Sequence, residues 1–247
     1  VWTVTAWSML IGASLLIVGM FVVPAEHATA ADVMWGAVAG VAGLGGLVIL
    51  YATLAAGTMS VVAPISGATS AVIPVVFDLV QGSTLTSRQW LGVAFGVAAV
   101  LLVGAQRGAG GVSPRIIGQA VAAGALFGLF FIALSQASSD SGLWPLVGAR
   151  AASIPLAFLI AFAARAVAPP GGRDLWLLAA VGGLDMSANI AIALAIQTGP
   201  LGVNAVLSSL YPVVTAVAAV LVLRERPTAV QIGGIGFAVG AIVALAL

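Results

Sequence analysis

The chain of 247 residues contains no cysteine, no lysine and a single histidine, His27. The absence of cysteine excludes disulfides, thiolate nucleophiles and thiolate metal sites. One histidine in a polar loop makes a histidine-based metal centre or a Ser–His–Asp triad very hard to build. We therefore expect no bound metal, no other cofactor and no enzymatic active site.

Charge is also scarce, since only 6% of the residues are charged and 62% are hydrophobic. Soluble domains carry about a quarter charged residues, so this chain could not cover a soluble surface. The net charge of +1 comes with no basic patch and no phosphate-binding glycine loop, which argues against nucleic-acid binding and direct ATP coupling. The composition is that of an integral membrane protein in contact with the lipid bilayer.

Nine apolar runs approach the ~20 residues that a helix needs to cross a bilayer. Very short connectors, such as residues 55–58, require neighbouring helices to be antiparallel. The first run precedes a signal-like Ala28-Thr29-Ala30, but it lacks a basic start and its apolar stretch is too long for a secretory signal. The sequence therefore predicts an all-α polytopic membrane protein. The predicted spans are residues 1–23, 33–54, 59–81, 89–105, 116–136, 143–164, 175–197, 200–223 and 228–247.

The second half of the chain repeats the first at a constant offset, which pairs Gly57 with Gly199. Residues 57–99 align with 199–241 without a gap, and about a third of these pairs are identical, Ser66 with Ser208 among them. The offset leaves span 116–136 without a partner, so we expect a native unit of five plus five helices whose first helix is missing here. An odd number of spans per copy makes the two copies inverted. The predicted repeats are residues 1–110 and 111–247.

The residues of this repeat resemble a known family. Segment 199–215, GPLGVNAVLSSLYPVVT, followed by LRERPT at 223–228 and QIGG at 231–234, resembles the EamA repeat of the drug/metabolite transporter superfamily. The first copy shows the same order in AAGTMSVVAP at 55–64 and in Thr86, Gln89 and Gly92. One departure is that Glu225, an acidic position typical of the family, aligns with Ser83.

This resemblance implies a ten-helix transporter of small organic solutes that works by alternating access through a cavity between the repeats. We expect such a protein in the inner membrane of a bacterium or archaeon, as a monomer or homodimer. No nucleotide-binding motif is present, so a solute or proton gradient would drive transport. The alternatives are a channel-like protein and a non-transporting subunit of a membrane assembly.

Proline interrupts two spans that are repeat partners, at Pro64 and Pro74 in 59–81 and at Pro212 in 200–223. Proline removes a backbone donor, so we expect both helices to be broken, and matching broken helices are typical of transporter sites. Polar side chains on these and the preceding span are therefore substrate-binding candidates, although hydroxyls that only pack helices and bond their own backbone are the alternative. The candidates are Ser66, Ser70, Ser208, Tyr211 and Tyr51, the last also fitting an interfacial anchor.

A second candidate group is charged. Asp185 lies near the middle of span 175–197, Asn189 lies four residues later on the same helical face, and Arg150 lies inside the preceding span. An unpaired carboxylate at that depth would be strongly destabilised. Either Arg150 and Asp185 form a structural ion pair, or Asp185 couples transport to a proton while Arg150 and Asn189 bind the solute. Asp78, near the end of span 59–81, is interpreted as a solvated helix-end charge.

Overall fold

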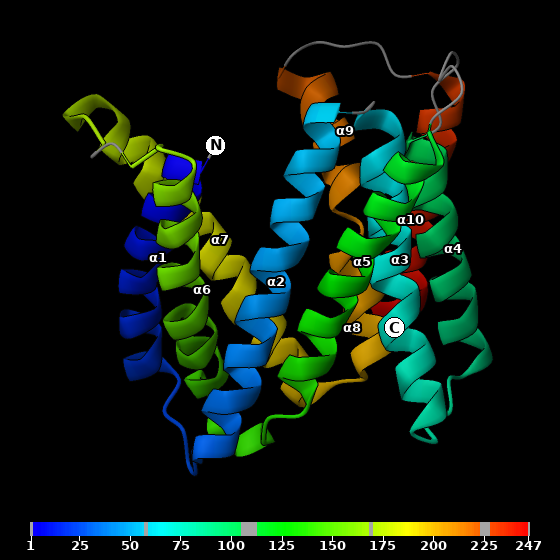
Figure 1. Cartoon of the computed structure of the whole chain (residues 1–247). Coiled ribbons are helices and arrows are strands. Elements are labelled where there is room, and N and C mark those ends of the chain that lie inside the picture. Colours follow the sequence, from blue (N-terminus) through cyan, green and yellow to red (C-terminus); the bar gives the residue numbers. More distant parts are fainter. Residues whose placement is uncertain (1, 57–58, 105–112, 168–169, 223–227, 247) are drawn as a thin grey trace. The chain divides into compact units, whose positions relative to one another are not determined.

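Figure 1 shows the computed structural model of the chain, which describes residues 2–56, 59–104, 113–167, 170–222 and 228–246. Every regular element within these ranges is helical. Six of the helices are long and apolar enough to cross a membrane, and shorter apolar helices occupy 87–103, 201–214 and 229–245. The chain is thus an all-α polytopic membrane protein, as predicted.

The helices follow the predicted spans to within a few residues, with one exception. Span 200–223 forms two helices, α8 and α9, instead of one. The elements are α1 (Trp2–Val22), α2 (Ala30–Ala56), α3 (Met59–Val80), α4 (Ser87–Gly104), α5 (Pro114–Ser135), η1 (Ser139–Ser141), α6 (Trp144–Ala163), α7 (Gly172–Thr198), α8 (Leu201–Ser208), α9 (Tyr211–Val222) and α10 (Ala229–Ala246).

The repeat in sequence is also a repeat of helices. Under the alignment that pairs Gly57 with Gly199, the bounds of α2, α3 and α4 coincide with those of α7, of α8 together with α9, and of α10. The first residue of α6, Trp144, is likewise the equivalent of Trp2, the first residue of α1. The predicted division between repeats, at residue 110, lies outside the described residues and stays a prediction.

Helices α4 and α10 begin with the same side-chain cap. Thr86 N–H and Oγ1 donate to Gln89 Oε1 over 2.9 and 3.2 Å, and Thr228 N–H and Oγ1 donate to Gln231 Oε1 over 2.9 and 3.3 Å. Each threonine Oγ1 in turn accepts from the backbone N–H of its glutamine over 3.3 Å. This reciprocal capping satisfies amides that the first turn of a helix leaves without a partner.

The described residues pack into two compact units, and each unit takes helices from both repeats. Unit 1 comprises Val1–Leu44 and Ile132–Thr198, and unit 2 comprises Gly45–Phe131 and Gly199–Leu247. Within unit 1, α1 packs on α6 and α7. Within unit 2, α4 packs on α10, and α3 packs on α8.

Close helix contacts in unit 1 follow the repeat. A Cβ on Gly182 of α7 would collide with the Ser8 carbonyl oxygen of α1, and a Cβ on Gly40 of α2 would collide with the Ala149 carbonyl oxygen of α6. Gly40 is the repeat equivalent of Gly182, and Ala149 lies next to the equivalent of Ser8. The contacts of α1 with α7 and of α6 with α2 are therefore equivalent, and both depend on glycine for the close approach.

In unit 2, α4 and α10 cross in a reciprocal way. A Cβ on Gly92 would lie 2.5 Å from Leu245 Cγ, and a Cβ on Gly234 would lie 2.7 Å from Val103 Cγ2. Gly92 is the repeat equivalent of Gly234, and Val103 is the equivalent of Leu245. The start of each helix thus meets the end of the other, so the two helices are antiparallel.

One residue at this crossing meets its own equivalent. The rings of Phe95 and Phe237 pack edge to face, with centroids 5.2 Å apart and an interplanar angle of 86°. Reciprocal contacts around a self-paired residue are those of a two-fold axis. Because α4 and α10 are antiparallel, this local axis lies across the helices, as inverted repeats require.

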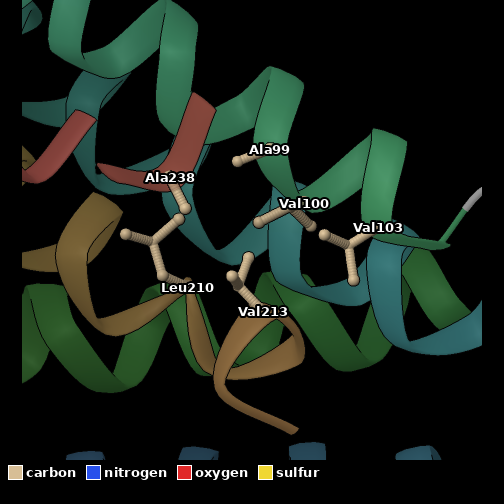
Figure 2. Close-up of a cluster of buried hydrophobic side chains, with 6 residues drawn as sticks. All are labelled: Ala99, Val100, Val103, Leu210, Val213 and Ala238. Carbon is tan, nitrogen blue, oxygen red and sulfur yellow. The ribbon is translucent and has the colours of Figure 1, made fainter. Parts of the chain in front are cut away.

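Two apolar clusters fill the core of unit 2. The Ala71 cluster contains Ala71, Val75, Val93 and Val206. The Val213 cluster contains Ala99, Val100, Val103, Leu210, Val213 and Ala238 (Figure 2). Ala71 is the repeat equivalent of Val213, so the clusters occupy corresponding places in the two copies.

Candidate functional site

The charged candidates meet in unit 1. Arg150 Nη2 of α6 donates to Asp185 Oδ2 of α7 over 2.6 Å. The Arg150 side chain is only 11% exposed, whereas that of Asp185 is 47% exposed. The guanidinium is thus held among helices while the carboxylate keeps about half of its surface uncovered.

Asn189 completes this group from the next turn of α7. Its Nδ2 donates to the Asp185 backbone carbonyl over 2.7 Å and to Asp185 Oδ1 over 3.3 Å. Both carboxylate oxygens therefore have a donor, one charged and one neutral. The expected grouping of Arg150, Asp185 and Asn189 is present, while their role in transport stays a prediction.

The first copy carries no such group. The equivalents of Arg150, Asp185 and Asn189 are Ser8, Gly43 and Leu47. Ser8 is buried, and its hydroxyl donates to the Thr5 carbonyl of its own helix over 3.2 Å. The two copies share helices and close contacts, but the charged pair belongs to the second copy alone.

The hydroxyl candidates of unit 2 meet in part, where α3 passes the start of α9. Ser66 Oγ and Tyr211 OH lie 3.1 Å apart, and Tyr211 OH also donates to the Ala63 carbonyl over 3.3 Å. Ser66 is fully buried, whereas Tyr211 is 38% exposed. These contacts link the two helices that the sequence singled out by their prolines.

The remaining candidates have different surroundings. The Ser70 hydroxyl is buried and donates to the Gly67 carbonyl of its own helix over 2.8 Å, as the packing interpretation expects. Ser208 is half-buried at the end of α8, and Tyr51 of α2 is 37% exposed. The charged group and the hydroxyl group belong to different units.

The expected break in both proline-containing helices is wrong for α3. Helix α3 runs unbroken through Pro64 and Pro74. The break occurs only after Ser208, and α9 restarts at Tyr211 with Pro212 in its first turn. A first-turn proline lacks only a donor that would have no helical partner there, so Pro212 favours a new helix start. The α3 equivalent of Pro212 is Ser70, which keeps its N–H.

Asp78, interpreted from the sequence as a solvated helix-end charge, is half-buried and also has a partner within the protein. Its Oδ2 accepts a hydrogen bond from the backbone N–H of Gly202 over 2.7 Å. Pro200 at the N-cap of α8 makes no side-chain capping bond, and the α3 carboxylate supplies the missing acceptor. A helix start without a capping side chain was the sequence signal for a partner, but it did not say which one.

Asp32 is a second acid with partners in the protein, and sequence reasoning did not single it out. It is 3% exposed, and its Oδ2 accepts from Thr29 N–H and Oγ1 over 2.8 and 2.7 Å. Its Oδ1 accepts from Ser138 N–H over 2.7 Å, across 106 residues. Asp32 thus ties the turn before α2 to the segment after α5, a structural role.

Within the described ranges, no three His, Cys, Asp or Glu side chains are grouped so that they could hold a metal ion. The candidate site residues described above contribute one ion pair, an amide and hydroxyls. Such groups can bind a polar organic solute or exchange a proton.

Comparison with known proteins agrees with this architecture. A family described as "EamA-like transporter family" matches residues 115–247. No curated protein matches the chain. A solved structure described only as "Crystal structure of protein" is similar to the chain with a TM-score of 0.80 and 16% identity. That similarity covers 100% of this chain and 88% of the other, and at such identity it concerns the fold alone.

Proposed function

The chain belongs to the EamA-like transporter family, and we propose that it is a secondary active transporter that moves a small organic solute by alternating access. It is a multi-pass membrane transporter of the drug/metabolite type, in contact with the bilayer and a small solute. The proposal adds that the two inverted repeats expose the solute to each side in turn, and that a proton drives the cycle.

The observation that supports the proposal is the pair of Arg150 with a half-uncovered Asp185 in the middle of α7. A charge inside the bilayer costs several kcal/mol unless it is paired or reaches a polar cavity. A pair that served packing alone would bury both partners, yet the carboxylate is the more open one. An open carboxylate can take up a proton and release Arg150.

This release gives a coupling step. Protonation of Asp185 removes the negative partner of the Arg150 guanidinium. The freed guanidinium can then bind a carboxylate or another anionic group of the solute, and Asn189 Nδ2 can hydrogen-bond the same group. A zwitterionic or modest-sized neutral solute fits this small polar group better than a polyanion does.

The other functions remain weaker proposals. A channel or non-transporting subunit would not need a charged pair in one copy only. An enzyme would need an acid–base or metal cluster, and the sequence contains too few such residues. We place the protein in the inner membrane of a bacterium or archaeon, as a monomer or homodimer, on the expectation drawn from the sequence.

The test is solute flux in proteoliposomes, after a thermal-shift screen of a metabolite panel has identified a solute. We expect saturable uptake that depends on an imposed pH gradient. D185N should reduce gradient-driven uptake at least tenfold while it retains solute counterflow, because an amide cannot exchange the proton. D174N is the matched control, since Asp174 lies exposed in the first turn of the same helix, and it should behave as the wild type.

Two results would contradict the proposal. Gradient-driven uptake in D185N equal to that of D174N would remove Asp185 from coupling and leave a structural ion pair. Flux that rises linearly with solute concentration and shows no counterflow would indicate a channel.

A further inference from the structure

The contact between Asp78 and Gly202 joins the end of α3 to the start of α8. The carboxylate accepts the Gly202 N–H over 2.7 Å, and a Cβ on Gly202 would lie 3.1 Å from Val75 Cα. The first turn of α8 therefore packs directly on the last turns of α3. A carboxylate at a helix N-terminus gains from both the free amides and the helix dipole.

The two helices run antiparallel, so this contact lies at one end of the pair. A Cβ on Gly67, near the middle of α3, would lie 3.5 Å from the Ser209 carbonyl oxygen, while Val75 lies beside Gly202. Residues later in α3 thus contact residues earlier in the α8 segment, so the two helices are antiparallel. Because α3 is a span, its two ends lie at opposite faces of the membrane.

The residue types of this contact are not repeated in the sequence. Under the repeat alignment, Asp78 corresponds to Val220 and Gly202 corresponds to Ser60. Valine has no oxygen that could accept a hydrogen bond from an amide. The repeat-equivalent pair, Val220 and Ser60, therefore cannot form this carboxylate–amide bond.

We infer that Asp78 is a positioning residue that closes one membrane face of the protein, a one-sided latch between α3 and α8. This inference rests on the proposed alternating access, in which each face opens in turn. The Ala71 and Val213 clusters close corresponding parts of the two copies by apolar packing. Asp78 adds a charged hydrogen bond on the side of the Ala71 cluster and so favours states that are closed there.

The absence of cysteine from the chain allows a direct test with single-cysteine labelling. V75C reports on the Ala71 cluster and V213C on the Val213 cluster (Figure 2), and the two wild-type side chains are 4% and 6% exposed. Each variant is placed in nanodiscs, where both membrane faces are accessible, and its rate of reaction with a membrane-impermeant maleimide is measured without solute.

Two independent changes open the latch. D78L removes the acceptor, and G202A keeps it but places a Cβ 3.1 Å from the Cα of residue 75, a contact that V75C retains, which pushes α8 away from α3. Each should raise the labelling rate of V75C about tenfold, as expected for the loss of one charged hydrogen bond, and leave V213C within about twofold. D78N is the conservative control, because its amide oxygen can still accept the Gly202 N–H as a neutral hydrogen bond, and it should raise the V75C rate clearly less than D78L does.

Labelling that rises equally at V75C and V213C would show general loosening and overturn the latch, as would an unchanged rate at V75C in both opening variants. This outcome is separate from that of the proposed function, because the labelling needs no solute. Transport without one-sided labelling would contradict the role of Asp78 as a latch and leave the proposed transport intact. One-sided labelling without solute flux would contradict the proposed transport function.

Discussion

Arg150 and Asp185 are unequal partners in their ion pair. The arginine is 11% exposed and the aspartate 47%. Arginine cannot lose its charge in a protein, whereas a carboxylate can become protonated. The consequence of losing a partner therefore differs between the two groups. A guanidinium without its partner stays charged, whereas a carboxylate without its partner can become neutral by binding a proton.

This inequality predicts an order of stabilities. D185L should lower the free energy of unfolding by at least about 2 kcal/mol, because it leaves a mostly buried charge without its partner. R150M should cost less, and the double variant R150M/D185L should recover most of the loss. Thermal unfolding in one detergent measures all three, and an R150M variant less stable than D185L would contradict the argument.

Sequence reasoning could group Arg150, Asp185 and Asn189 because helix period and depth in the membrane are readable from position. It could not find the partner of Asp78. That partner is a backbone N–H 124 residues away, and every residue except proline offers one. Gly202 has no side chain beyond a hydrogen atom, so the residue type does not indicate this contact.

At the scale of elements, the spans were predictable because bilayer thickness sets their length. The break between α8 and α9 was less predictable. Three prolines were read as equivalent interruptions, but α3 continues through Pro64 and Pro74 while the chain breaks before Pro212. A proline's effect depends on its place in the local turn, and the sequence does not show where a helix will restart.

We predict that P212A closes the break between α8 and α9. Alanine restores an N–H that can bond to the Ser208 carbonyl, so one helix should continue through Ser209 and Leu210. Hydrogen exchange of the peptide containing these residues should slow about tenfold. P64A is the control, because α3 is already continuous there, and unchanged exchange in P212A would assign the break to tertiary contacts instead.

At the scale of the whole molecule, the close contacts of α4 and α10 test the repeat. G234A should lower the free energy of unfolding by about 1–3 kcal/mol, because its Cβ would meet Val103 Cγ2 at 2.7 Å and the Val103 backbone nitrogen at 2.9 Å. G92A should cost less, since its Cβ would first meet the flexible Leu245 side chain.

G233A is the matched control for this pair. A Cβ on Gly233 would have open space around it, so alanine should be neutral or stabilise the helix by about 0.5–1 kcal/mol. Thermal unfolding of the three variants gives the order. Equal effects of G233A and G234A would show that the helix, and not the crossing, determines the cost.

The pairing of Phe95 with Phe237 has a consequence for the history of the chain. If the halves descend from one gene, that ancestor formed this contact between two identical subunits, each phenylalanine against its own copy. Identical subunits can cross in antiparallel fashion only when they insert into the membrane in opposite senses. The ancestral subunit must then have inserted into the membrane in both orientations. Fusion of two copies into one reading frame fixed the ratio of the two orientations at one to one.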